Sequence, residues 1–142
     1  MSRIFWDTNL FVYLFEDYGN HSKQVKVLLQ KMDDRGDELL TSALTLGEVL
    51  AGPMQAGDLD CCDRYEKAIR SNGIVVPFDV SAARNFAKLR TQSGIKIRPP
   101  DAIQLACAAT AKVDLFLTND QRLHSLRVEG IHFITSVERA PI

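Results

Sequence analysis

The sequence predicts an α/β fold in which a parallel sheet of about five strands carries helices on both faces. Short apolar runs alternate with longer segments of helical periodicity along the chain, and no internal repeat or low-complexity tract interrupts them. This alternation is typical of parallel sheets, because each strand is joined to the next through a crossover helix. The length of 142 residues fits a single domain over residues 1–142.

The individual elements follow from apolar spacing and from glycine and proline stops. The apolar runs predict strands at residues 4–6, 38–42, 74–76, 115–117 and 131–134. Helical spacing predicts helices at residues 8–16, 22–33, 44–51, 59–71, 81–91 and 100–112. We expect Gly52-Pro53 to interrupt the third helix, and the nearly all-apolar last helix to be buried.

The composition excludes several classes of protein. Hydrophobic residues make up 46% of the chain and the formal net charge is -1, so nucleic-acid binding would need a local basic rim. The cysteines Cys61, Cys62 and Cys107 have neither disulfide nor metal-site spacing, which indicates free thiols in a reducing compartment. With no signal peptide and no apolar run long enough for a membrane, we expect a cytoplasmic protein.

Four acidic residues fall where the predicted strands end or helices begin. Asp7 directly follows the first strand, and Asp120 follows the fourth. Glu48 lies one to two turns past the second strand, and Asp101 opens the buried helix. Because the carboxyl ends of parallel strands meet at one edge of the sheet, these four carboxylates are expected on the same edge.

Each acid alone also fits a capping role. Asp7 can cap the first helix, and Asp101 and Asp120 can favour helix N-termini through the dipole. The segment Thr45-Leu46-Gly47-Glu48 fits a capping box.

The four acids together favour a cation site. Glu48 and Asp101 are each the only charge in a long apolar segment, and burying an uncompensated carboxylate costs several kcal/mol. Two carboxylates about 4 Å apart repel by roughly 4 kcal/mol at an effective dielectric of 20. With almost no buried Lys or Arg nearby in the sequence, and so no local countercharge expected, a divalent cation is the expected neutraliser, and all-oxygen ligands suit Mg²⁺ or Mn²⁺.

These motifs resemble the PIN domain family, and within it the VapC-like toxins of bacterial toxin–antitoxin pairs. The resemblance covers nearly the whole chain and rests on four segments in order: Asp7-Thr8-Asn9-Leu10, Leu46-Gly47-Glu48-Val49, 100–106 (PDAIQLA) and Leu117-Thr118-Asn119-Asp120. It implies a Rossmann-like sheet, Mg²⁺- or Mn²⁺-dependent cleavage of RNA, a homodimer, and inhibition by a cognate antitoxin encoded nearby.

The resemblance also implies roles for individual residues. It makes catalytic metal ligands of Asp7, Glu48, Asp101 and Asp120. It also makes Asn9 and Thr118 supporting polar groups that orient carboxylates or waters. A basic antitoxin segment that plugs the acidic cleft is a physically reasonable mode of inhibition, because a guanidinium can bridge two carboxylates.

Two basic residues precede Asp101, and two other functions are compatible with parts of the sequence. Lys96 and Arg98 precede Asp101 and are candidates for RNA-phosphate contact, although an ordinary solvated loop explains them slightly better. A Mg²⁺-dependent phosphatase of the haloacid dehalogenase type would need a second aspartate where this chain has Asn9. A non-catalytic PIN-fold module that only binds RNA or protein is the other alternative, and loss of one acid would favour it.

Overall fold

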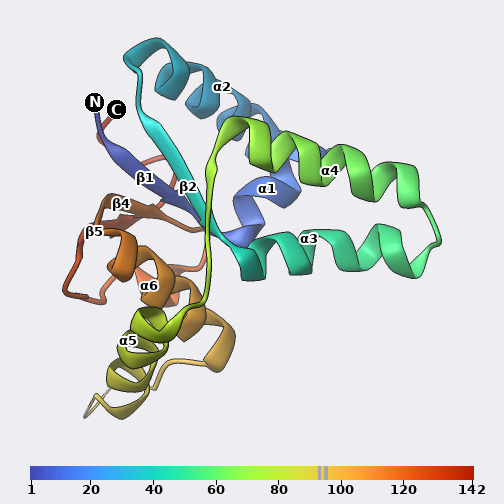
Figure 1. Ribbon diagram of the computed structural model, residues 1–142. Helices are drawn as coiled ribbons and strands as arrows, with labels where there is room; N and C mark the ends of the chain where they lie inside the picture. Colours follow the sequence, from blue (N-terminus) through green and yellow to red (C-terminus); the bar gives the residue numbers. More distant parts are fainter. Residues whose placement is uncertain (93, 95) are drawn as a thin grey trace.

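The computed structural model describes residues 1–92, 94 and 96–142, and its five strands form one parallel sheet (Figure 1). The strands are β1 (Arg3–Trp6), β2 (Glu38–Ser42), β3 (Ile74–Val76), β4 (Val113–Leu117) and β5 (Ile131–Thr135). Their order in the sheet is β3-β2-β1-β4-β5, and every neighbouring pair is parallel. The predicted α/β class and parallel sheet are therefore confirmed.

The predicted helices are all present in the described part of the chain, with ends shifted by at most four residues. They are α1 (Thr8–Phe15), α2 (Asn20–Arg35), α3 (Ala43–Gln55), α4 (Leu59–Asn72), α5 (Val80–Thr91) and α6 (Pro99–Ala111). A short 3-10 helix, η1 (Gln121–Leu123), was not predicted, because three residues are too few to show a period. Among the described residues no helix is both long and apolar enough to cross a membrane.

The prediction that Gly52-Pro53 interrupts the third helix is wrong. Helix α3 continues to Gln55 with Pro53 inside it. Proline costs a helix one hydrogen bond from its own nitrogen, and here that loss falls in the last turn. The backbone N–H of Ala56 still donates to the Gly52 carbonyl at 3.1 Å, so the turn closes beyond the proline. In Figure 1, α3 and α4 form a hairpin that projects from the sheet.

Two apolar layers hold the sheet between helices. Side chains from α1, α2, α3 and α4 pack on one face, where Ile4 and Trp6 of β1 are fully buried. Helices α5 and α6 pack on the other face against Phe5, whose ring stacks on Phe116 at a centroid distance of 5.1 Å. The expected burial of the last helix is confirmed, because the seven consecutive residues from Ala102 to Ala108 include six that are buried.

The strand order places a topological switch between β1 and β4. The chain proceeds outward from β1 through β2 to β3, then crosses over through α5 and α6 to β4 on the other side of β1. In open parallel sheets the crevice beyond the carboxyl ends of strands at such a switch is the usual ligand site. The residues that follow β1 and β4 are Asp7 and Thr118, and the Asp7 N–H donates to the Leu117 carbonyl at 3.0 Å.

Candidate active site

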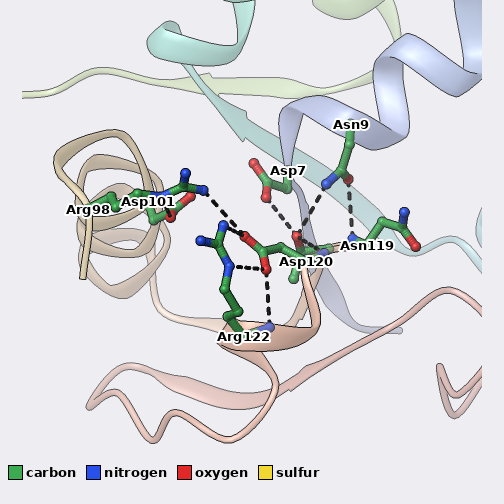
Figure 2. Close-up of polar contacts among 8 residues, drawn as sticks. Asp7, Asn9, Arg98, Asp101, Asn119, Asp120 and Arg122 are labelled. Carbon is green, nitrogen blue, oxygen red and sulfur yellow. Dashed lines mark hydrogen bonds and ion pairs between the residues drawn. The ribbon is translucent and has the colours of Figure 1, made fainter. Parts of the chain in front are cut away.

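The four predicted acids lie at this carboxyl edge on four different elements. Asp7 follows β1, Glu48 lies in α3, Asp101 lies in the first turn of α6, and Asp120 is the N-cap of η1. Figure 2 shows Asp7, Asp101 and Asp120 gathered in one region of the molecule. The pKa of Asp7 is raised, mainly because burial removes water from its carboxylate, and additionally by the negative charges of Asp101 and Glu48. Three of the acids are thus near enough to repel one another.

Asp7 is the buried member of the group, with 8% of its surface exposed. Its Oδ2 accepts a 2.7 Å hydrogen bond from the Thr118 hydroxyl, and its Oδ1 accepts a 2.8 Å bond from the Thr8 N–H. The Gln104 amide nitrogen lies 3.2 Å from the same Oδ1. Both oxygens of Asp7 are therefore held in place by donors from three other residues, and these bonds partly offset the cost of burying the charge.

Thr118 connects Asp7 with the loop that carries Asp120. Besides donating to Asp7, its hydroxyl oxygen accepts from the Asp120 N–H at 3.1 Å and from the Asn9 side-chain amide at 3.4 Å. The Asn9 carbonyl oxygen in turn accepts from the Asn119 N–H at 3.3 Å, as the dashed lines of Figure 2 show. Asn9 and Thr118 lie beside the acids, and their part in binding a metal stays a prediction.

Glu48 is exposed, which corrects the expectation that its apolar neighbours in sequence would bury it. It lies on the side of α3 that faces the carboxyl edge, where Glu48 Oε1 accepts a 2.6 Å hydrogen bond from the Thr8 hydroxyl. Asp101 and Asp120 are partly exposed, at 18% and 20% of their side chains. Desolvation therefore burdens only Asp7 severely, and the other three acids remain in contact with solvent.

The expectation that the acids have no local countercharge is wrong. Arg122 donates to both Asp120 oxygens, at 2.9 and 2.5 Å, and lowers the pKa of that carboxyl. Arg98 lies between two acids, 3.4 Å from Asp101 Oδ2 and 3.8 Å from Asp120 Oδ2. Both arginine side chains are 62% exposed. Sequence spacing missed these pairs because a basic residue two or three positions from an acid contacts it only when the backbone turns suitably.

The capping roles are partly realised. Asp7 Oδ1 caps α1 through the Thr8 N–H, and Asp120 Oδ1 accepts from the Arg122 N–H at 3.1 Å at the start of η1. The capping box at Glu48 is not formed, because α3 begins one turn earlier with Ser42 as its N-cap. Capping and ligand binding are compatible for Asp7, because its Oδ2 takes no part in the cap.

The donor set suits a hard cation, although the carboxylates must move to bind one. Within residues 1–92, 94 and 96–142, no three acidic, histidine or cysteine side chains converge closely enough to hold an ion as they stand. The Arg98 guanidinium nevertheless lies between Asp101 and Asp120, so a positive group already occupies the space that those two carboxylates share. Carboxylate oxygens are the ligands that Mg²⁺ and Mn²⁺ prefer. We therefore regard the residues as fitting such an ion after side-chain rotation.

Two contributors to this site were not predicted. Gln104 was visible as the one amide in an apolar helix, three residues after Asp101, and that position was a usable signal. Arg122 offered none, because nothing in the sequence separates it from the other exposed arginines. Lys96 is exposed in the loop before α6, and its contact with RNA stays a prediction.

The fold and the site define a class of protein, a parallel α/β domain with acids at the switch of its sheet. The family model described as PIN domain matches residues 4–129, so the chain belongs to the PIN domain family. Of the curated proteins searched, none matches.

Several solved structures share this fold. FitAcB from Neisseria gonorrhoeae superposes with a TM-score of 0.72 at 20% identity, covering 96% of this chain and 99% of that chain. VapBC2 from Rickettsia felis, bound to a DNA fragment from its promoter, gives 0.71 at 16% identity over 94% and 98%. VapBC-5 from Mycobacterium tuberculosis, a member of the VapBC family of toxin-antitoxin systems, gives 0.60 at 21% over 96% and 99%. At these identities the likeness shows a common fold.

Proposed function

We propose that the chain is an endoribonuclease that requires Mg²⁺ or Mn²⁺ and acts as the toxin of a toxin–antitoxin pair. The observation that carries the proposal is Asp7: a buried carboxylate at the switch of the sheet, held by three donors and flanked by further acids. A merely structural carboxylate would gain nothing from neighbours that repel it. A divalent cation would attract each carboxylate and so offset their mutual repulsion. Membership of the PIN domain family supports nuclease chemistry at this edge.

Each residue has a part in this proposal. A Mg²⁺ or Mn²⁺ ion bound by Asp7, Glu48, Asp101 and Asp120 would make hydroxide available near neutral pH and stabilise charge on the scissile phosphate. Asp7 stays in a fixed orientation because Thr118, Thr8 and Gln104 donate to it. Lys96 and Arg98 stand on the exposed approach to Asp101, where RNA phosphates would pass.

The antitoxin part of the proposal is supported by the fold and by the arginines. Solved structures of this fold include a toxin-antitoxin complex from Klebsiella pneumoniae. In this chain Arg98 and Arg122 already show that guanidinium groups bind Asp101 and Asp120. A partner arginine entering the same place would compete with a metal ion for the same oxygens. We expect apolar contacts beside this cleft to supply most of the affinity, because a desolvated charge pair only about breaks even.

A homodimer remains part of the proposal, with a changed physical basis. The apolar residues on the first and third helices predicted from the sequence favour packing against a twin, yet Leu10 and Phe11 of α1 are buried inside the chain. The large apolar side chains that are exposed in the described chain include Met54 of α3, Leu59 of α4, and Ile74, Phe78 and Val80 in and beside β3. The others are Met1, Tyr18, Val27 and Phe133. Such an interface would be isologous, and sedimentation showing a monomer at high micromolar concentration would contradict it.

A second candidate is a PIN-fold module that binds RNA without cleaving it. The pairing of Arg122 and Arg98 with Asp120, and of Arg98 with Asp101, favours this candidate, because two of the four acids are paired with cations without a metal. Nothing in the described chain removes one of the four acids, so the nuclease remains the better-supported function.

Cleavage of a structured RNA pool by the purified chain separates the two candidates. The proposal predicts cleavage with Mg²⁺ or Mn²⁺, none in excess chelator, and recovery when metal is restored. Asp101→Asn should lose cleavage, whereas the matched change Asp63→Asn on α4 should keep it, because Asp63 is exposed and distant in sequence from all four acids. RNA binding without cleavage under every metal condition would favour the binding module.

A further inference from the structure

Gln104 is a buried amide in the otherwise apolar helix α6, with 2% of its surface exposed. Its nitrogen lies 3.2 Å from Asp7 Oδ1 and 3.0 Å from Thr8 Oγ1, both at the junction of β1 and α1. The same nitrogen lies 2.7 Å from Thr45 Oγ1 of α3. The amide oxygen accepts from the Ser42 hydroxyl at the end of β2. A single side chain thus joins the elements that meet at the carboxyl edge.

The partners of Gln104 determine which way its amide points. An ionised Asp7 only accepts hydrogen bonds, so it requires the NH₂ group on its side. The Ser42 oxygen accepts from the Thr45 N–H at 3.3 Å, which leaves the Ser42 proton for the amide oxygen of Gln104. Both partners favour the same orientation. A flipped amide would put its oxygen against the Asp7 carboxylate, where two acceptors repel each other, so the ionised Asp7 selects the orientation with the NH₂ group on its side.

Gln104 also reaches two further acids. The Thr8 hydroxyl donates to Glu48 at 2.6 Å, so its oxygen is free to accept from Gln104. Asp101 lies three residues earlier on α6, and residues three apart share a helix face. Asp7 is therefore oriented by Gln104 directly, Glu48 through one hydroxyl, and Asp101 through the helix that both residues occupy.

We infer that Gln104 is a positioning residue of the metal site: it orients Asp7 and Glu48 for a shared divalent cation without touching RNA. The inference rests on the proposed function. It differs from a purely structural role, in which Gln104 would only satisfy buried hydroxyls between α6 and α3. A structural role predicts lost stability with normal metal affinity, whereas a positioning role predicts weakened metal affinity in a folded protein. Changes to groups that orient metal ligands typically weaken metal binding by about 10- to 100-fold.

The test compares Gln104→Met, which keeps the length of the side chain without its hydrogen bonds, with Thr110→Val. Thr110 lies on the same helix and accepts from Asn85 at 2.9 Å, on the far side from the acids, so its variant removes a comparable bond elsewhere. Free Mn²⁺ is measured by electron paramagnetic resonance during titration, and folding is checked by circular dichroism. We expect Mn²⁺ binding about 10- to 100-fold weaker in Gln104→Met and unchanged in Thr110→Val. At saturating Mn²⁺, kcat for RNA should fall while KM stays unchanged.

The outcomes separate this inference from the proposed function. Unchanged Mn²⁺ affinity in a folded Gln104→Met protein overturns the positioning role while leaving the nuclease proposal intact. A wild-type chain that binds no Mn²⁺ overturns both. If Gln104→Met does not fold, Gln104→Asn takes its place, because it keeps an amide but is one methylene too short to reach all of its partners. Normal Mn²⁺ affinity in that variant overturns the inference equally.

Discussion

Arg122 donates two side-chain hydrogen bonds to the carboxylate of Asp120, at 2.9 and 2.5 Å, and a third from its backbone N–H at 3.1 Å (Figure 2). This fork-like pairing directs both Asp120 oxygens toward the arginine. A metal ion that binds Asp120 must therefore displace the Arg122 guanidinium or share the carboxylate with it. The pKa of Arg122 is raised by the same contact, so the guanidinium stays charged and competes at every physiological pH.

Arg122→Gln should strengthen Mn²⁺ binding. The arginine side chain is 62% exposed, and exposed ion pairs are weak, so we expect the metal Kd to fall only about two- to fivefold. Arg70→Gln is the matched control, because Arg70 pairs with Glu66 at 3.3 Å on α4, away from the acids. Isothermal titration with Mn²⁺ measures the change, and weaker binding in Arg122→Gln would show that the arginine supports the ion instead.

Asp7→Asn should stabilise the metal-free protein at neutral pH. Burial and the charges of Asp101 and Glu48 raise the pKa of Asp7 in the folded state. A carboxyl with a raised native pKa costs the wild type stability as the pH rises from its unfolded value, about 4, through the native value. The melting temperature of the variant should therefore exceed that of the wild type by roughly 2–5 °C at pH 7.

The same reasoning predicts that this advantage disappears below about pH 4, where both states of the wild type are protonated. Thermal melts in chelator from about pH 3 to about pH 8 follow the difference across the unfolded-state pKa. An advantage for Asp7→Asn that does not depend on pH would mean that repacking, rather than charge, causes it.

Thr118→Val should destabilise the fold by about 1–3 kcal/mol, because it leaves buried polar partners unsatisfied. Thr118 is fully buried, and its hydroxyl serves Asp7, the Asp120 N–H and Asn9 together. Thr118→Ser keeps the hydroxyl and should lose much less stability. Urea unfolding measures both variants, and equal losses would contradict the prediction, because they would mean that the methyl group contributes as much stability as the hydroxyl.

Much of the fold could be predicted from local patterns. Runs of apolar residues predict helix α6 and strand β4, and the alternation of strands with helices along the chain predicts the parallel sheet. The placement of Asp7, Asp101 and Asp120 at one edge also followed, because each lies at the end of a strand or the start of a helix. The helix break predicted at Pro53 was wrong, because the free-energy cost of a proline depends on its place within the helix.

What could not be predicted depends on side-chain direction. The exposure of Glu48 depends on which face of α3 turns to solvent, whereas its apolar neighbours in sequence predicted that it would be buried. The pairing of Arg122 with Asp120 depends on the 3-10 turn between them, which no periodicity reveals. The contacts of Gln104 join residues 59 to 97 positions apart, so only the folded chain brings them together.

Asp7, Glu48, Asp101 and Asp120 are proposed to form one catalytic metal site. A crystal structure with Mn²⁺ tests this proposal most directly. Anomalous diffraction locates the ion independently of the surrounding atoms. We expect a peak within about 2.0–2.6 Å of oxygens from at least two of Asp7, Glu48, Asp101 and Asp120, directly or through their waters, with Arg122 displaced from Asp120. No peak at this edge in saturating Mn²⁺, or four carboxylates still pointing apart, would contradict it.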